Sequence, residues 1–181
     1  GLPTSCPDRG TWGIGDDDGG QGEALRTPYA DANLVTVPGG LAAADDTRLL
    51  DLLACTDVMA TGLHSAMMAG VGEGSTAVVV GDGAVGLCAV LGAIELLKAE
   101  RVILLSRNPA RQDVGRRFGA TDIVAARGEE ARQAVLDLTD GHGAPHVIEA
   151  VGTADAWQTT LDVVSDGGQI GAVGVPHTAP A

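Results

Sequence analysis

The chain has 181 residues, of which 45% are hydrophobic, so it is long and apolar enough for one domain with a core. A formal net charge of −13 disfavours binding to nucleic acid and to anionic membrane surfaces. There is no bilayer-spanning apolar run, no signal peptide at the start, and no disulfide framework among three distant cysteines. We expect a cytoplasmic protein and, because the chain begins without Met, a fragment or a processed product.

The first third of the chain has little periodicity. Gly, Pro and Asp dominate residues 1–22, which predicts a loop. Two short β-prone pieces on either side of Pro28, at 24–26 and 34–37, predict hairpin-like fragments with little core of their own. A turn is then expected at 38–40, followed by helices over 42–54 and 57–69.

Strands alternate with helices over the rest of the chain. The continuous apolar run at 76–80 is typical of a strand buried on both faces of a parallel sheet. Further strands are expected at 101–105, 122–124, 146–150 and 169–173, and helices at 84–98, 109–118, 129–138 and 155–164. This alternation predicts an α/β fold, a Rossmann doubly wound parallel sheet with right-handed crossovers.

A glycine-rich turn connects the first of these strands to its helix. Gly81, Gly83 and Gly86, with Ala84 and Val85 between the last two, fit the pattern G-x-G-x-x-G in the required strand–turn–helix context. The first glycine permits the tight turn, the second lets the backbone approach a pyrophosphate, and the third lets helix and strand pack closely. The pattern predicts a dinucleotide site. An ordinary strand–turn–helix and a methyltransferase nucleotide site are the alternatives.

The end of the second strand indicates which nicotinamide cofactor is bound. An NAD site usually has a carboxylate about twenty residues past the glycine pattern, accepting from the ribose 2′-hydroxyl. That count leads to Ser106 and Arg107, with Arg111 one helical turn further. A hydroxyl beside a guanidinium suits a 2′-phosphate, so we predict NADP(H) in preference to NAD(H). The alternative is that Arg107 points into solvent.

Several segments in order resemble the zinc-dependent medium-chain alcohol dehydrogenases. They are DGGQGEA at 18–24, RTP at 26–28, DVMATGLHSA at 57–66, FGATD at 118–122 and GVPH at 174–177. The resemblance implies a partial GroES-like, β-rich catalytic-domain remnant over 1–56. It implies a Rossmann domain over 57–181, truncated at its C-terminus, and a full-length parent that forms homo-oligomers.

The resemblance also gives roles to two residues whose side chains can bind a metal. Asp57 matches the third ligand of the family's catalytic zinc, although a carboxylate there is also a good helix N-cap. Cys6 resembles the tail of a four-cysteine structural zinc lobe. The remaining ligands of both sites would precede this sequence, so we expect Zn²⁺ only in a full-length parent.

Further family positions would line the nicotinamide side of the cofactor. Thr61 matches a residue near the nicotinamide ring. The loops at two C-terminal strand ends correspond to Val151 and Gly152, and to Val173, Gly174 and Val175. Simple packing is the alternative for each.

The implied parent reaction is reversible hydride transfer between NADP(H) and an alcohol–carbonyl pair, with zinc polarising the substrate oxygen. We assign no residue of this chain a catalytic role and expect it to be poorly active alone. The alternatives are a non-catalytic nucleotide-binding module and a zinc-free quinone or enoyl reductase of the same superfamily.

Overall fold

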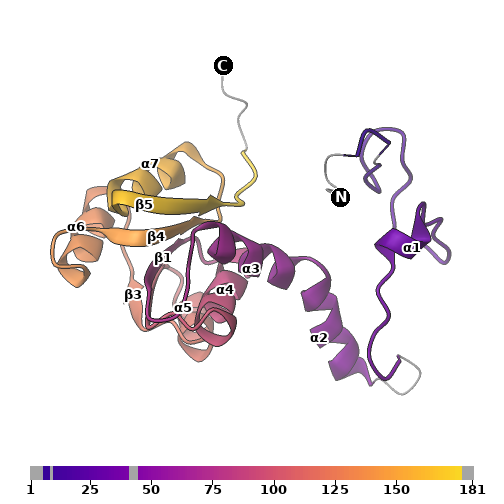
Figure 1. Ribbon diagram of the computed structural model, residues 1–181, viewed down its shortest axis with the longest axis horizontal. Coiled ribbons are helices and arrows are strands. Elements are labelled where there is room, and N and C mark those ends of the chain that lie inside the picture. Colours follow the sequence, from indigo (N-terminus) through magenta and orange to yellow (C-terminus); the bar gives the residue numbers. More distant parts are fainter. Residues whose placement is uncertain (1–5, 9, 41–44, 177–181) are drawn as a thin grey trace. The chain divides into compact units, whose positions relative to one another are not determined.

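The computed structural model describes residues 6–8, 10–40 and 45–176 and divides into two compact units, Gly1–Ala44 and Asp45–Ala181 (Figure 1). The described part of the first unit is mostly loop, as expected, with a single antiparallel bridge between Thr11 and Ile14 and one short helix, α1 (Ala30–Asn33). The expected turn at 38–40 is confirmed by a hydrogen bond from the Gly40 N–H to the Val37 carbonyl, 2.9 Å.

The hairpin expected between 24 and 37 is wrong. Its pieces on both sides are described, and neither forms a strand. Instead Tyr29 takes a left-handed φ of 52° and α1 begins after it, while the Asn33 amide donates to the Pro28 carbonyl at 2.7 Å. Pro28 has no N–H to give to a ladder, and pieces of three or four residues gain too little from pairing with each other.

The second unit begins with two consecutive helices and continues as an alternating α/β domain. Its elements, in chain order, are α2 (Asp46–Thr56), α3 (Val58–Met68), β1 (Thr76–Val80), α4 (Ala84–Leu91), η2 (Gly92–Leu96), β2 (Arg101–Leu105), α5 (Pro109–Arg117), β3 (Asp122–Val124), α6 (Gly128–Leu138), β4 (Ala144–Glu149), α7 (Ala154–Val163) and β5 (Val164–Ala172). The helix α5 begins as predicted, since the Asn108 side chain accepts from the Arg111 N–H and Pro109 occupies the first turn.

All five strands form one parallel sheet in the order β3-β2-β1-β4-β5. The strand β1 therefore lies in the middle, and the chain returns to it after β3 to add β4 on its other side. The predicted α/β class and doubly wound sheet are confirmed. The carboxyl ends of β1 and β4, which pair directly, meet at one edge. Such a reversal of strand order is where open α/β sheets bind their ligands.

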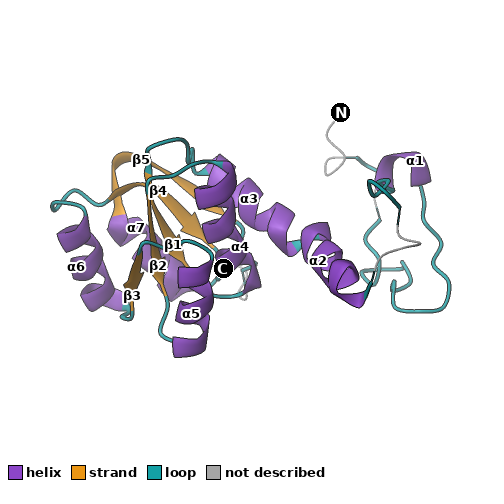
Figure 2. Ribbon diagram, turned by 90° about the horizontal axis from the view of Figure 1, so that it is seen from below, coloured by secondary structure: helices purple, strands orange, loops and turns teal. Residues whose placement is uncertain are grey.

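Helices cover both faces of the sheet (Figure 2). One face of β1, carrying Ala77 and Val79, packs in a cluster that includes residues of α3, α4 and η2. The other face, carrying Val78 and Val80, packs in a cluster that includes residues of α6 and α7. Because both faces are buried, β1 has no polar alternation, which is why it is a continuous apolar run.

Three elements differ from their predictions more than the others, whose ends shift by no more than two residues. The helix expected over 84–98 changes to a π-helical turn, η2, where Gly92 lies against Leu63 of α3, and it ends before Lys98, which has a φ of 61°. The strand β5 starts five residues earlier than expected because Val164 already pairs with Ala144. The helix α2 begins at Asp46, capped by Asp45, and residues 42–44 lie outside the described residues.

The helix α2 belongs to the second compact unit. The domain boundary after residue 56 comes from the family resemblance and stays a prediction. Among the described helices, none combines the length and apolarity that crossing a membrane requires.

Candidate functional site: a nucleotide-binding edge

The glycine turn after β1 is shaped by close backbone contacts. Gly81 has a φ of 119°, and a Cβ there would meet the Val151 side chain at 2.7 Å and the Ala150 carbonyl oxygen at 3.2 Å. A Cβ at Gly86 would overlap the Gly81 carbonyl. By contrast, no atom lies within 4 Å of the Cβ position at Gly83. The turn is therefore closed at its first and third glycines and open at its second, where a ligand can approach.

The helix α4 begins directly behind the open glycine. Gly83 is its N-cap residue and supplies no capping side chain, so the first N–H groups, at Ala84 and Val85, face no protein acceptor from the cap. Uncapped N–H groups and the positive end of the helix dipole favour a bound anion. The turn thus has the space and the donors that a pyrophosphate needs.

The loops after β4 and β5 lie against each other at the same edge. A Cβ at Gly152, whose φ is 86°, would overlap the Val175 carbonyl oxygen, and a Cβ at Gly174 would overlap the Gly152 backbone nitrogen. The Val151 side chain in turn lies close to Gly81, 2.7 Å from where a Cβ would be. The structure therefore brings the predicted residues of these loops, Val173 included, beside the glycine turn, with Val175 exposed.

Glu149, the last residue of β4, ties these two loops together. Its side chain is fully buried, and Oε1 accepts the N–H groups of Val151 and Gly152, both at 2.8 Å. Its main-chain carbonyl accepts from Val173 at 2.9 Å and Gly174 at 3.2 Å. Oε2 has no hydrogen-bond partner among the described residues. Glu149 was not among the residues predicted from the sequence, although a carboxylate at the end of an apolar strand is a signal for such a residue.

Two of the residues predicted to contact the adenosine 2′-phosphate, Ser106 and Arg111, lie around a further carboxylate, Asp82. We call these three residues the adenosine corner. The Ser106 hydroxyl donates to Asp82 Oδ2 at 2.7 Å, and Arg111 Nη1 donates to Oδ1 at 3.1 Å. Burial by itself would raise the pKa of Asp82, but the hydrogen bonds from Ser106 and Arg111 outweigh it and hold that pKa below its ordinary value. Arg107 is exposed and makes no hydrogen bond or ion pair with the described part of the chain. A charged residue inside the glycine pattern was the overlooked signal.

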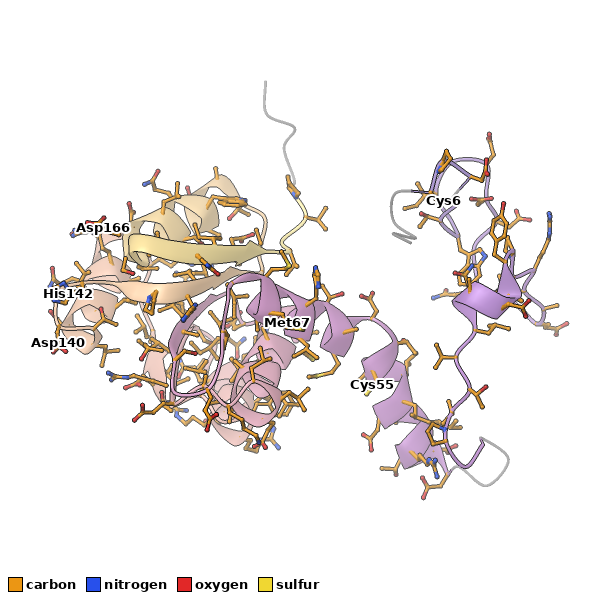
Figure 3. All side chains as sticks on the ribbon, in the orientation of Figure 1. Cys6, Cys55, Met67, Asp140, His142 and Asp166 are labelled. Atoms are coloured by element: carbon orange, nitrogen blue, oxygen red, sulfur yellow. The ribbon has the colours of Figure 1, made fainter. Side chains whose placement is uncertain are left out.

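The two predicted zinc ligands have different surroundings. Asp57 is the N-cap residue of α3, and its Oδ1 accepts the Thr61 hydroxyl at 3.0 Å, so the predicted nicotinamide residue and the predicted ligand are partners. Cys6 is exposed in the first unit (Figure 3). Among residues 6–8, 10–40 and 45–176, no three His, Cys, Asp or Glu side chains gather as a metal site. A catalytic zinc needs three protein ligands, so these residues alone do not fit one.

A separate cavity of about 370 Å³ lies at the opposite edge of the sheet, near the start of β4. Its lining includes His142 and Asp166, which Figure 3 places together with Asp140 at that end of the second unit. Ligands of parallel α/β sheets bind at the carboxyl edge instead, so this cavity is not part of the nucleotide site.

The fold agrees with the comparison to known families. A family described as zinc-binding dehydrogenase matches residues 84–181, more than half of the chain. The chain belongs to the zinc-binding dehydrogenase family. The family resemblance seen in the sequence is thereby confirmed.

This zinc-binding dehydrogenase chain is 35% identical over 158 residues to an alcohol dehydrogenase of Cupriavidus necator, covering 87% of the chain and 41% of the relative. It is 36% identical over 153 residues to the NADP-dependent isopropanol dehydrogenase of Thermoanaerobacter brockii, covering 84% and 42%. The zinc-dependent alcohol dehydrogenase 2 from Streptococcus pneumonia, in its apo form, superposes with a TM-score of 0.82 at 28% identity, covering 98% of the chain and 49% of that structure. The chain therefore spans less than half the length of each of these proteins.

Proposed function

We propose that this chain is the nucleotide-binding part of an alcohol-dehydrogenase-type oxidoreductase that transfers a hydride between NADP(H) and a small alcohol–carbonyl pair. The observation that carries the proposal is the glycine turn, open at Gly83 and closed at Gly81 and Gly86, at the carboxyl edge between β1 and β4. The names of the relatives as alcohol dehydrogenases support the reaction class.

Each end of the cofactor has a proposed set of residues. The N–H groups at the start of α4 hold the pyrophosphate. The nicotinamide lies along the loops after β4 and β5, where the backbone groups of Val175 recognise its carboxamide, with Thr61 near the ring. The bound nicotinamide supplies the hydride chemistry, and the chain supplies its position. Glu149 keeps the two loops in register by accepting the N–H groups of the β4 loop.

The proposed preference for NADP(H) rests on the end of β2. This strand is followed by Ser106 and Arg107 rather than by the carboxylate that usually accepts a ribose 2′-hydroxyl. Arg107 is exposed and free of protein partners in the described chain, so its guanidinium is available to a 2′-phosphate. The NADP-dependent isopropanol dehydrogenases among the relatives support this choice.

Zinc and assembly are proposed only for a longer parent protein. Asp57 is one ligand of the expected catalytic zinc, and Cys6 one ligand of the expected structural zinc, on the family resemblance. Since one carboxylate does not hold a catalytic zinc, we expect the 181-residue chain to turn over slowly or not at all. A homo-oligomeric parent is proposed on the same basis.

The direct test is a titration of the 181-residue chain with NADPH and with NADH, followed by nicotinamide fluorescence or calorimetry. We expect saturable binding of both and a lower Kd for NADPH. A folded sample that binds neither rejects the nucleotide site, and a lower Kd for NADH rejects the NADP(H) preference. Zinc content and oxidation of a secondary alcohol, both measured on a longer parent protein, then separate an enzyme from a non-catalytic binding module.

A further inference from the structure

The adenosine corner contains its own anion. Asp82 lies between the first two glycines of the turn, and its carboxylate binds Ser106 and Arg111, which the sequence predicts as contacts of the 2′-phosphate. These contacts join residues 24 and 29 positions apart, so they bring the β1–α4 turn and the β2–α5 loop together. The side chain of Asp82 is mostly buried, with 20% of its surface exposed.

Ser106 is buried and is held in place through both its main-chain N–H and its main-chain carbonyl. Its residue is 3% exposed, its N–H donates to the Val124 carbonyl at 3.0 Å, and its carbonyl accepts from the Gln112 side chain at 2.7 Å. A serine hydroxyl has a single hydrogen to donate. While that hydrogen is donated to Asp82, Ser106 cannot donate to a phosphate.

Arg111 behaves differently from Ser106. Its side chain is 54% exposed and only one of its N–H groups contacts Asp82. A guanidinium has five N–H donors in a planar fork, so Arg111 can contact Asp82 and a phosphate at the same time. The cost of a bound 2′-phosphate therefore comes from the engaged Ser106 hydroxyl and from the negative charge of Asp82 beside the dianion.

The geometry points to Asp82 as a residue that determines cofactor specificity by opposing the 2′-phosphate. This inference rests on the proposed function. Its carboxylate occupies the hydroxyl of Ser106 and repels a second anion at the same corner, so it lowers the preference for NADP(H) that Arg107 and Arg111 create. It does not oppose NAD(H), because a ribose 2′-hydroxyl can donate to a carboxylate oxygen.

The test compares Asp82→Asn with the unchanged 181-residue chain. Asparagine keeps the size of the side chain and an oxygen for Ser106 but removes the charge. We expect the Kd for NADPH to fall by about tenfold, the scale of one screened like-charge contact, while the Kd for NADH changes by roughly twofold or less. Asp137→Asn, on the exposed end of α6, removes the same charge away from this corner and should change neither Kd.

A second pair of ligands isolates the 2′-phosphate. Adenosine 2′,5′-bisphosphate and 5′-AMP differ only in that group, so Asp82→Asn should strengthen binding of the first and not of the second. The gain should shrink as the salt concentration rises, because salt screens the removed repulsion. Asp82→Ala, which also releases the Ser106 hydroxyl, should likewise strengthen the binding of adenosine 2′,5′-bisphosphate relative to that of 5′-AMP.

Other results overturn the inference. Equal changes in the Kd for NADPH and in the Kd for NADH mean that Asp82 affects the whole turn and not the binding of the 2′-phosphate. Weaker NADPH binding in Asp82→Asn means that Asp82 orients Ser106 and Arg111 for the phosphate. In both cases the unchanged chain still binds cofactor, so the proposed function stands. Failure of the folded, unchanged chain to bind either cofactor rejects the proposed function itself and the inference with it.

Discussion

Two glycines of the same turn should respond in opposite ways to the same substitution. Gly83 has a φ of −74°, which alanine adopts readily, and no atom lies within 4 Å of its Cβ position. At Gly86 the Cβ would overlap the Gly81 carbonyl oxygen and lie 2.9 Å from the carbonyl carbon. We predict that Gly83→Ala leaves the fold intact and weakens cofactor binding, whereas Gly86→Ala destabilises the fold.

The size of each effect follows from what the new methyl group meets. At Gly86 the obstructing atoms are backbone and cannot rotate away, so the strain lies near the upper end of the usual range for overpacking, about 3 kcal/mol. The better helix propensity of alanine offsets about 1 kcal/mol, leaving a loss of about 2 kcal/mol in the free energy of unfolding. At Gly83 that free energy should change by less than about 1 kcal/mol, because alanine at a compatible φ mainly restricts the unfolded chain.

The effect of Gly83→Ala on binding comes from the space in front of the turn. If the pyrophosphate lies there, the added methyl group meets it as overpacking, at about 1–3 kcal/mol, or a Kd for NADPH raised by about 5- to 150-fold. Urea denaturation followed by circular dichroism measures stability, and an NADPH titration measures the Kd. Unchanged NADPH binding in Gly83→Ala would refute a phosphate at this face. Full stability in Gly86→Ala would refute the packing argument.

Two further predictions concern stability. Replacing Glu149 by Leu leaves the buried N–H group of Gly152 and the partly buried N–H group of Val151 without their acceptor, so the urea midpoint should fall by the equivalent of about 2 kcal/mol or more, and Glu149→Gln, which keeps an oxygen, should lose less. An equal loss in both variants would argue against these hydrogen bonds as the cause. The hydrogen bond from Arg101 is the main influence on the pKa of Asp122 and holds it below its ordinary value. A lowered pKa stabilises the fold above the unfolded value, and this is lost as the pH falls through the folded value. Asp122→Asn should therefore cost roughly 1 kcal/mol at pH 7, after solvent screening, and flatten the acid limb of the stability curve below about pH 4, and an unchanged acid limb would contradict this.

Local sequence patterns were sufficient to predict those strands and turns whose structure depends mainly on their own residues. The strands at 76–80, 101–105 and 122–124 were predicted with their observed bounds, because each lies between turn residues and is rich in branched apolar residues. The cap at Asn108 and Pro109 is equally local. The glycine spacing predicted the two positions of the turn, Gly81 and Gly86, at which a side chain has no room.

Contacts between distant residues decided the rest. The residues at 34–37 have strand-forming side chains but pair with no strand in the described part of the chain. The strand β5 is longer than predicted because Val164 pairs with Ala144. The role of Asp82 likewise depends on Ser106, 24 residues away, which only the sheet brings beside it.

The amino-acid sequence by itself determined the parallel α/β fold, the order of its elements and the glycine turn between β1 and α4, because periodicity and glycine positions act over a few residues. Tertiary structure alone decided that Glu149 joins two loops and that Asp82 lies against Ser106 and Arg111. A carboxylate has no fixed partner in the chain, and its charge acts only on groups that folding brings within a few ångströms.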